Sequence, residues 1–251
     1  MASEGWTAAP SGELSLPADE VHVWRLPLRP PPGVLRRVEA HLSAAERDRA
    51  ARFRFAEHRD AFVAGRGIQR EILARYAGAA PAAIAYGESP HGKLSLAGDA
   101  AESGIRFNVS NAGELALVAV VRDRELGVDL EKLKPMPDGL DIARRFFSEP
   151  ENRVFAALDQ AVRELAFFRC WTRKEAYIKA VGEGLSMPLD RFDVAFAPGE
   201  EACLLATRGD PSEAARWSMA GLEPAPGYVG ALAVEGGGWR LRRFDWSAPP
   251  G

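Results

Sequence analysis

The segment GVDLE, residues 127–131, places two carboxylates, Asp129 and Glu131, on either side of a leucine. Side chains alternate between the two faces of a β-strand, so both acids would point to one face and Val128 and Leu130 to the other. Two anions about 6–7 Å apart on one face repel each other unless a positive group lies between them. The pattern therefore predicts a positively charged group next to this strand.

A second group of chemically competent residues lies in FFRCWTRKEAYIKAVGEGLSMPL, residues 167–189. Trp171, Glu175 and Lys179 follow one another at intervals of four residues and so share one face of a helix. Lys174 directly precedes Glu175. A surface ion pair between Glu175 and Lys179 would explain those two residues, but it leaves the tryptophan and the GEGLSMP loop unexplained.

Taken together, the two segments indicate a site for a metal-bound diphosphate. Asp129, Glu131 and a third carboxylate supply the oxygen ligands that Mg²⁺ prefers, and such a site leaves room for water and phosphate oxygens. Basic side chains would bind the remaining phosphate charge. Residues 36–75 contain ten arginines and six acids, which fits either a solvated helix face or an anion-binding wall.

Composition and charge narrow the class of protein. The chain has 251 residues, of which 47% are hydrophobic, enough for one large domain or two smaller ones, and its net charge of −3 argues against a general nucleic-acid binder. No apolar run approaches the roughly 18 residues of a membrane span. Cys170 and Cys203 are too few for a disulfide framework or a zinc cluster. We therefore expect a cytoplasmic protein without a membrane or nucleic-acid partner.

The start of the chain and its first half have distinct patterns. Residues 1–20 contain acids and prolines and lack the regions of a secretory signal, so a disordered leader is expected there. The pattern then predicts a strand at 21–28, helices between 33 and 76, and three strands joined by turns over 104–131.

In the second half, Ser148 and Glu151 form a helix-capping pattern, and helical residues continue to Val181 with a break near Gln160. Strand-like runs fill the tail, at 192–197, 202–207, 216–223, 228–234 and 239–244. Each half passes from helices into strands. This predicts an α+β fold of two similar subdomains, 21–126 and 127–251.

With FNVSN (107–111) upstream, GVDLE and WTRKEAYIKAVGEGL resemble the motifs of the Sfp-type 4′-phosphopantetheinyl transferases. The likeness continues in order through DIARRFFSEPE and GLSMPLDRFDV and covers about residues 20–235. It implies two pseudo-symmetric α/β subdomains with coenzyme A in the cleft between them. It also implies transfer of the phosphopantetheine arm to a serine of an acyl or peptidyl carrier protein, with release of adenosine 3′,5′-bisphosphate.

The resemblance also assigns roles to residues by motif. The Mg²⁺ ligands, with Mn²⁺ as an alternative ion, would be Asp129, Glu131 and Glu175. The catalytic residues would be Glu175, a base acting directly or through water, and Lys179 on the breaking diphosphate, together with Lys174, which would support the helix and the geometry of the site. The residues that bind coenzyme A would be Arg49, Arg66, Lys93, Ser110, Asn111 and Lys179, with Trp171 and Glu151 in support.

Two positions depart from the family pattern. Asn111 stands where many members have a histidine, and because an amide adds no positive charge we expect weaker coenzyme A binding there. Glu46 lies in an arginine-rich stretch where the family commonly has a base. An alternative to the active enzyme is a catalytically inactive paralogue that only binds coenzyme A or a carrier protein. The complete set of acids and lysines argues against it. Analogy at the level of the fold predicts a monomer that serves secondary metabolite biosynthesis.

Overall fold

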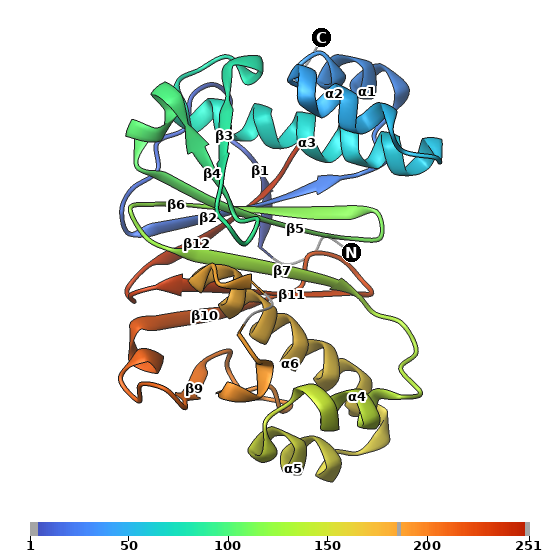
Figure 1. The fold of residues 1–251 in the computed structure, drawn as a ribbon, viewed down its shortest axis with the longest axis vertical. Helices are drawn as coiled ribbons and strands as arrows, with labels where there is room; N and C mark the ends of the chain where they lie inside the picture. The colour runs from blue at the N-terminus through green and yellow to red at the C-terminus, as the bar shows by residue number, and fades with distance from the viewer. Residues whose placement is uncertain (1–4, 185–186, 249–251) are drawn as a thin grey trace.

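The computed structural model describes residues 5–184 and 187–248. Figure 1 shows two β-sheets lying one above the other between two groups of helices, one group from each half of the chain. Each half thus buries one face of its sheet under its own helices. This confirms the α+β fold of two subdomains predicted from the sequence. The halves differ in size, because the first sheet has five strands and the second has three.

The first sheet has the strand order β1-β12-β2-β6-β5. Its strands are β1 (Trp6–Ala8), β2 (Glu20–Pro27), β5 (Ile105–Ala112), β6 (Leu115–Arg122) and β12 (Arg240–Asp245). The helices of this half are α1 (Pro32–Glu39), α2 (Ala44–Ala51) and α3 (Ala56–Ala77). Helix α3 packs on the sheet through Ile68 and Ile72, which share a buried cluster with Trp24 of β2. The strand and helices expected between residues 21 and 76 are confirmed.

The second sheet is antiparallel, with β11 in the middle of the order β10-β11-β7. Its strands are β7 (Leu126–Lys132), β10 (Trp217–Leu222) and β11 (Tyr228–Glu235). The helices of this half are α4 (Gly139–Phe146), α5 (Glu149–Ala157) and α6 (Gln160–Val181). The predicted cap at Ser148, the break before Gln160 and the helix end at Val181 are confirmed.

Smaller elements complete each half. Two hairpins are formed by β3 (Ala85–Glu88) with β4 (Leu94–Ala97) and by β8 (Phe192–Val194) with β9 (Leu204–Thr207). Short 3₁₀ helices are η1 (Pro81–Ala83), η2 (Gly98–Ser103), η4 (Leu189–Arg191) and η5 (Glu213–Arg216). The β3–β4 hairpin was not predicted, since its strands are four residues long, one contains a glycine, and the loop that joins them contains a proline.

The two sheets pack on each other through a layer of buried aliphatic residues. Val21, Val23 and Leu117 of the first sheet share a buried cluster with Val128 and Leu130 of the second. Strand β7 therefore uses its even-numbered residues for the contact between the sheets. Its odd-numbered residues are left to face the other way, toward α6, as the alternation in GVDLE predicts.

Two boundary predictions need correction. Residues 5–20 are not a disordered leader: β1 pairs with β12 in parallel, and Leu16 is only 2% exposed, because apolar residues there complete the first core. Residues 1–4 lie outside the described part. Nor is 127–251 a self-contained unit, since β12 leaves the second half and joins the first sheet between β1 and β2.

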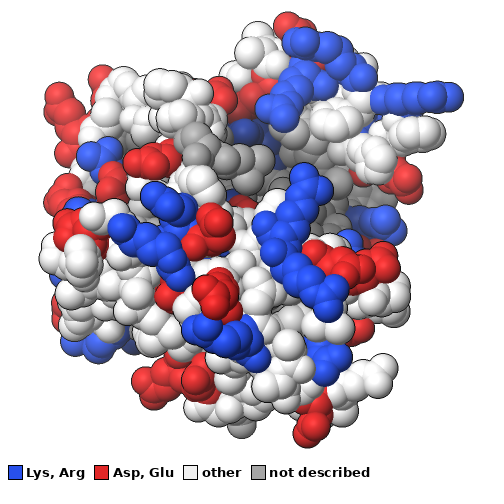
Figure 2. Space-filling model, turned by 60° about the horizontal axis from the view of Figure 1, so that its bottom comes forward, with Lys and Arg blue, Asp and Glu red and all other residues white. Residues whose placement is uncertain are grey.

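The surface carries charges of both signs. On the face shown in Figure 2, basic and acidic side chains are interleaved, without a continuous basic surface. Within residues 5–184 and 187–248, no helix has the length and apolar character needed to cross a membrane.

Candidate active site

Strand β7 and helix α6 approach each other closely because residue 127 is a glycine. A Cβ atom at this position would collide with backbone atoms of Ala176 and Ala180 and would lie 2.8 Å from the carbonyl carbon of Lys179. No side chain fits in that space. The glycine of GVDLE thus brings the two motifs found in the sequence into direct contact.

Lys179 supplies a positive charge to the acids on β7. Its Nζ lies 2.5 Å from Oδ1 of Asp129 and also donates to Ser110 Oγ at 3.1 Å. The Ser110 hydroxyl donates to the same Asp129 oxygen at 2.9 Å and accepts from the Leu130 amide at 3.2 Å. Asp129 itself is 5% exposed. The positive group that the sequence requires is, in this structure, a lysine of the chain itself.

Two further carboxylates, Glu131 and Glu175, lie near enough to Asp129 to interact with it. Burial raises the pKa of Glu131, and the charge of Asp129 raises it further. Burial is also the main cause that raises the pKa of Glu175, again with a contribution from Asp129, while Lys179 opposes the shift. For Asp129, burial raises the pKa against the opposing effect of Lys179. The three predicted metal ligands are therefore brought together with an excess of negative charge.

This donor set fits a divalent cation. Oδ2 of Asp129 is buried and has no hydrogen-bond partner among the described residues, so it is an acceptor available to a ligand. Carboxylate oxygens are the ligands that Mg²⁺ prefers. In residues 5–184 and 187–248, however, no three acidic, histidine or cysteine side chains are already arranged around a metal position. Lys179 instead neutralises Asp129.

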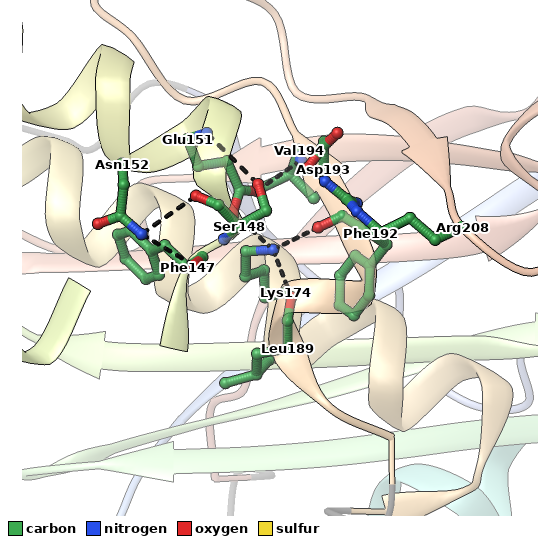
Figure 3. A network of polar contacts seen from close by, with 10 residues as sticks. All are labelled: Phe147, Ser148, Glu151, Asn152, Lys174, Leu189, Phe192, Asp193, Val194 and Arg208. Atoms are coloured by element: carbon green, nitrogen blue, oxygen red, sulfur yellow. Dashed lines mark hydrogen bonds and ion pairs between the residues drawn. The ribbon is translucent and has the colours of Figure 1, made fainter. Parts of the chain in front are cut away.

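Lys174 does not belong to this group, and its predicted catalytic role is not supported. Figure 3 shows its side chain directed into a polar network with Glu151, Leu189 and Phe192. Its Nζ lies 2.7 Å from Oε2 of Glu151 and donates to the carbonyls of Leu189 at 2.7 Å and Phe192 at 2.6 Å. One residue along a helix rotates the side chain by about 100°, so Lys174 and Glu175 face different surroundings. Lys174 is 0% exposed and holds α6 to the segment before β8.

Glu151, the acid in that network, connects several secondary-structure elements. Its Oε2 accepts from the Ser148 amide at 2.8 Å in the capping box of α5, and its Oε1 accepts from the Val194 amide at 2.9 Å. One carboxylate thus joins α5, β8 and, through Lys174, α6. Trp171 stacks on Phe167 of its own helix, with the ring centroids 6.0 Å apart. Both residues, for which the resemblance implied a supporting role, thus make contacts within the second half of the fold.

A pocket of about 550 Å³, within the range of small-molecule sites, is bordered by strand β5, and Asp129, Glu131 and Glu175 are not among its described lining residues. Strand β5 connects the pocket to the acids: Asn111 lines the pocket, while the residue before it, Ser110, bonds to Asp129. The lining also includes Arg66 and Lys93, both predicted to bind coenzyme A. Of the predicted binding residues, then, Arg66, Lys93 and Asn111 share one pocket, and Ser110 and Lys179 lie behind its wall.

Lys93, in the loop before β4, is held by two contacts with other elements. Its Nζ lies 2.6 Å from Oε2 of Glu125, in the turn before β7, and donates to the Ala180 carbonyl at 2.8 Å in the last turn of α6. The sequence offered little to single out Glu125, because an acid in the turn RDREL looks like an ordinary solvated residue. Asn108 was also missed, although it precedes Ser110 by two residues and shares its face of β5; its Oδ1 accepts from the Val128 amide at 2.9 Å.

Arg66 and Arg49, the arginines expected to contact coenzyme A, differ in position. Arg66 lies in the pocket wall, where its Nε is 3.4 Å from Oε1 of Glu46. Glu46 also pairs with Arg70, whose Nε is 2.8 Å from Oε2. Arg49 is exposed on α2 and lies outside the pocket lining, with its guanidinium 5.1 Å from the ring centroid of Phe62, a lining residue.

Comparison with known proteins supports the same conclusion as the site. The family model of the 4′-phosphopantetheinyl transferase superfamily matches residues 125–233, and the model of the 4′-phosphopantetheinyl transferase N-terminal domain matches residues 29–122. The boundary between the two models falls in the turn before β7, close to the boundary at 126 that the sequence predicted.

The chain is also similar to characterised members. It is 41% identical to the 4′-phosphopantetheinyl transferase HetI of Nostoc sp., over 98% of this chain and 100% of that one. It is 31% identical to the 4′-phosphopantetheinyl transferase Sfp of Bacillus subtilis, over 63% of this chain and 68% of the relative. A crystal structure of a holo-(acyl-carrier-protein) synthase from Bacillus anthracis in complex with CoA (3′,5′-ADP) aligns with 45% of this chain and 96% of its own, at 22% identity and a TM-score of 0.35.

The chain belongs to the 4′-phosphopantetheinyl transferase superfamily. It is a phosphopantetheinyl transferase of the Sfp type, which confirms the resemblance and the activity predicted from GVDLE and WTRKEAYIKAVGEGL.

Proposed function

We propose that the chain takes the phosphopantetheine arm from coenzyme A and attaches it to a serine of an acyl or peptidyl carrier protein, releasing adenosine 3′,5′-bisphosphate. The observation that carries this proposal is the meeting of Asp129, Glu131, Glu175 and Lys179 beside the 550 Å³ pocket. The acids can hold a cation and the lysine can bind phosphate oxygens. This arrangement suits a donor whose nucleotide occupies the pocket and whose diphosphate lies at the end of the pocket near these residues.

The divalent cation of the reaction would be held by Asp129, Glu131 and Glu175, as Mg²⁺ or Mn²⁺. When bound, it supplies positive charge that neutralises the diphosphate. The unpartnered Oδ2 of Asp129 supports this assignment. Lys179, which pairs with Oδ1 of Asp129, would with such a cation in place be able to bind the phosphate oxygens of the donor.

Glu175 is the proposed base. Burial and the charge of Asp129 raise the pKa of Glu175, and a cation held by the same carboxylate would oppose that shift. The proton passes to Glu175 directly or through a water molecule. Lys179 then stabilises the negative charge on the departing phosphate, which is the main requirement of phosphoryl transfer. Ser110 keeps Asp129 and Lys179 in register through its two hydrogen bonds.

The nucleotide end of coenzyme A would occupy the pocket against Arg66, Lys93 and Asn111, with Arg49 at its outer edge. The side chain of Asn111 offers hydrogen bonds without charge. We further propose that the protein acts as a cytoplasmic monomer on carriers of secondary metabolism.

The test is to incubate the protein with coenzyme A, Mg²⁺ and a panel of apo carrier proteins from fatty-acid, polyketide and peptide synthesis, and to weigh each carrier by mass spectrometry. We expect a mass gain of one phosphopantetheine group on at least one carrier, abolished by a chelator. No gain on any carrier would overturn the proposal and favour an inactive paralogue. A gain that survives chelation would overturn the metal assignment alone.

A further inference from the structure

The pocket beside the acids holds little uncompensated positive charge. Its described lining contains one arginine, Arg66, and one lysine, Lys93, and each is paired with a carboxylate. A pocket that binds an additional phosphate dianion usually presents basic groups that are free to engage it. Here the basic groups are already committed to partners within the protein.

The pair formed by Lys93 is held from two sides. Its Nζ contacts Glu125 at 2.6 Å and the Ala180 carbonyl at 2.8 Å, and its side chain is 17% exposed. Arg106 approaches the other oxygen of Glu125 at 4.0 Å. Turning Lys93 toward a ligand would break a charge-assisted bond and leave the carbonyl at the end of α6 without this donor.

The pair formed by Arg66 is part of a larger buried group. Glu46, with a side chain 13% exposed, accepts from Arg70 at 2.8 Å and lies 3.4 Å from Arg66. The Arg66 guanidinium also lies 5.0 Å from the centroid of the Tyr86 ring and donates to Oε1 of Gln69 at 3.2 Å. Arg66 is thus fixed in place by a carboxylate, an aromatic ring and an amide. Glu46 cancels part of the charge that the arginines bring to the wall.

Neutral hydrogen-bonding groups dominate the remaining polar lining. Asn108, Asn111 and Gln69 line the pocket; the Oδ1 of Asn108 already accepts from the Val128 amide, and the Nε2 of Gln69 is buried with no hydrogen-bond partner among the described residues. Amides of this kind suit hydroxyl groups. Two basic groups at the edge add little: Arg49 is exposed, and His58 lies in the lining 3.9 Å from Glu57 with both side chains largely exposed. Solvent screens such charges.

We propose that this pocket does not select for the 3′-phosphate of its donor, so that 3′-dephospho-coenzyme A, which ends in a neutral ribose, is used about as well as coenzyme A. This inference rests on the proposed function. The bond that forms and the bond that breaks are the same for both donors, and the leaving group is adenosine 5′-monophosphate in place of adenosine 3′,5′-bisphosphate.

The experiment compares the two donors with one apo carrier that the protein modifies, in the presence of Mg²⁺, following carrier mass to obtain kcat/KM. We expect the values to agree within about tenfold, a difference of about 1.4 kcal/mol. A larger preference for coenzyme A overturns the inference and leaves the proposed function intact. Absence of transfer from either donor overturns the proposed function and the inference with it.

Two variants test the physical cause. Glu46→Gln frees Arg66 and Arg70, while glutamine still serves in the capping box of α2. Glu125→Gln, at a partly exposed position, frees Lys93. Each is expected to raise the preference for coenzyme A several-fold. The matched control is Glu149→Gln, which removes an exposed ion pair with Arg153 on α5 and leaves the preference unchanged. If neither Glu46→Gln nor Glu125→Gln changes the preference while both fold normally, charge pairing is not its cause and the inference fails.

Discussion

Lys179 Nζ and Asp129 Oδ1 lie 2.5 Å apart, joining the last turns of α6 to the middle of β7. The pair neutralises a buried carboxylate that would otherwise be costly to leave charged. It also couples the two motifs of the family, because each motif contributes one partner. The charge of Asp129 is therefore the first feature of the site to test.

Replacing Asp129 with asparagine preserves the shape of the side chain and removes its charge. We expect the rate of transfer to fall by about 10²–10³-fold, the usual cost of losing one charged group that acts on the transition state. The measurement is the initial rate of mass gain on an apo carrier. Asp99→Asn, at an exposed position in η2, should leave the rate unchanged. Full activity of the Asp129 variant would show that the charge is not needed.

Lys174 allows a structural role to be tested, in contrast to the role of Asp129 in transfer. Lys174→Met is expected to lower the free energy of unfolding by about 3–5 kcal/mol, because Glu151 is left buried without its partner. Denaturant titration measures the change. The double variant with Glu151→Gln should recover part of the loss. A Lys174 variant with normal stability and lost transfer would restore the catalytic role predicted from the sequence.

Gly127→Ala tests the close approach of β7 and α6. The added methyl group would collide with the α6 backbone, and overpacking of this kind costs about 1–3 kcal/mol of unfolding free energy. Gly209→Ala is the control, because a Cβ there would have no atom within 4 Å. We expect a lower melting temperature for the first variant and little change for the second. Equal melting temperatures would mean that the helix can move away without cost.

His22 makes the first half sensitive to acid. Burial lowers the pKa of its imidazole below the usual 6.5, even though Glu20 opposes the shift, and its ring also bonds to the Tyr76 hydroxyl at 2.8 Å. Below pH about 6.5 the unfolded chain therefore binds more protons than the folded one, so stability falls as the pH drops through this window. His22→Gln should flatten the dependence of melting temperature on pH between about 6.5 and 5. The same change at exposed His91 should not. An unaltered slope in the His22 variant would assign the acid sensitivity to other groups.

Asn111→His adds a cation to the pocket that has no carboxylate partner there. We expect coenzyme A to bind about threefold to tenfold tighter below the pKa of the new imidazole, as measured by calorimetry. Asn111→Gln, which keeps the amide, is the comparison. If both variants bind coenzyme A equally, position 111 does not meet a phosphate.

Much of this site followed from short patterns with a physical meaning. The alternation in GVDLE predicted that Asp129 and Glu131 lie on one face of a strand. The spacing of four residues predicted that Glu175 and Lys179 lie on one face of a helix. The sequence could not show that Lys179 would pair with Asp129, because that depends on the approach of two segments far apart in the chain.

Other features depended on tertiary contacts alone. Lys174 and Glu175 are neighbours in sequence, yet one is fully buried against Glu151 and the other faces the acids. Lys93 pairs with Glu125, and Arg66 pairs with Glu46. Neither ion pair could be predicted from the amino-acid composition, which shows only a basic stretch with a few acids.

The placement of β12 has a consequence for biosynthesis. Strand β2 has β12 as one of its two neighbours, and β1 is joined to the sheet only through β12. Until residues 240–245 leave the ribosome, one edge of β2 is exposed and β1 has no strand to pair with. Strands β1 and β2 are thus translated well before β12 completes their pairing, so the nascent protein must keep an open sheet edge from aggregating throughout the synthesis of its second half.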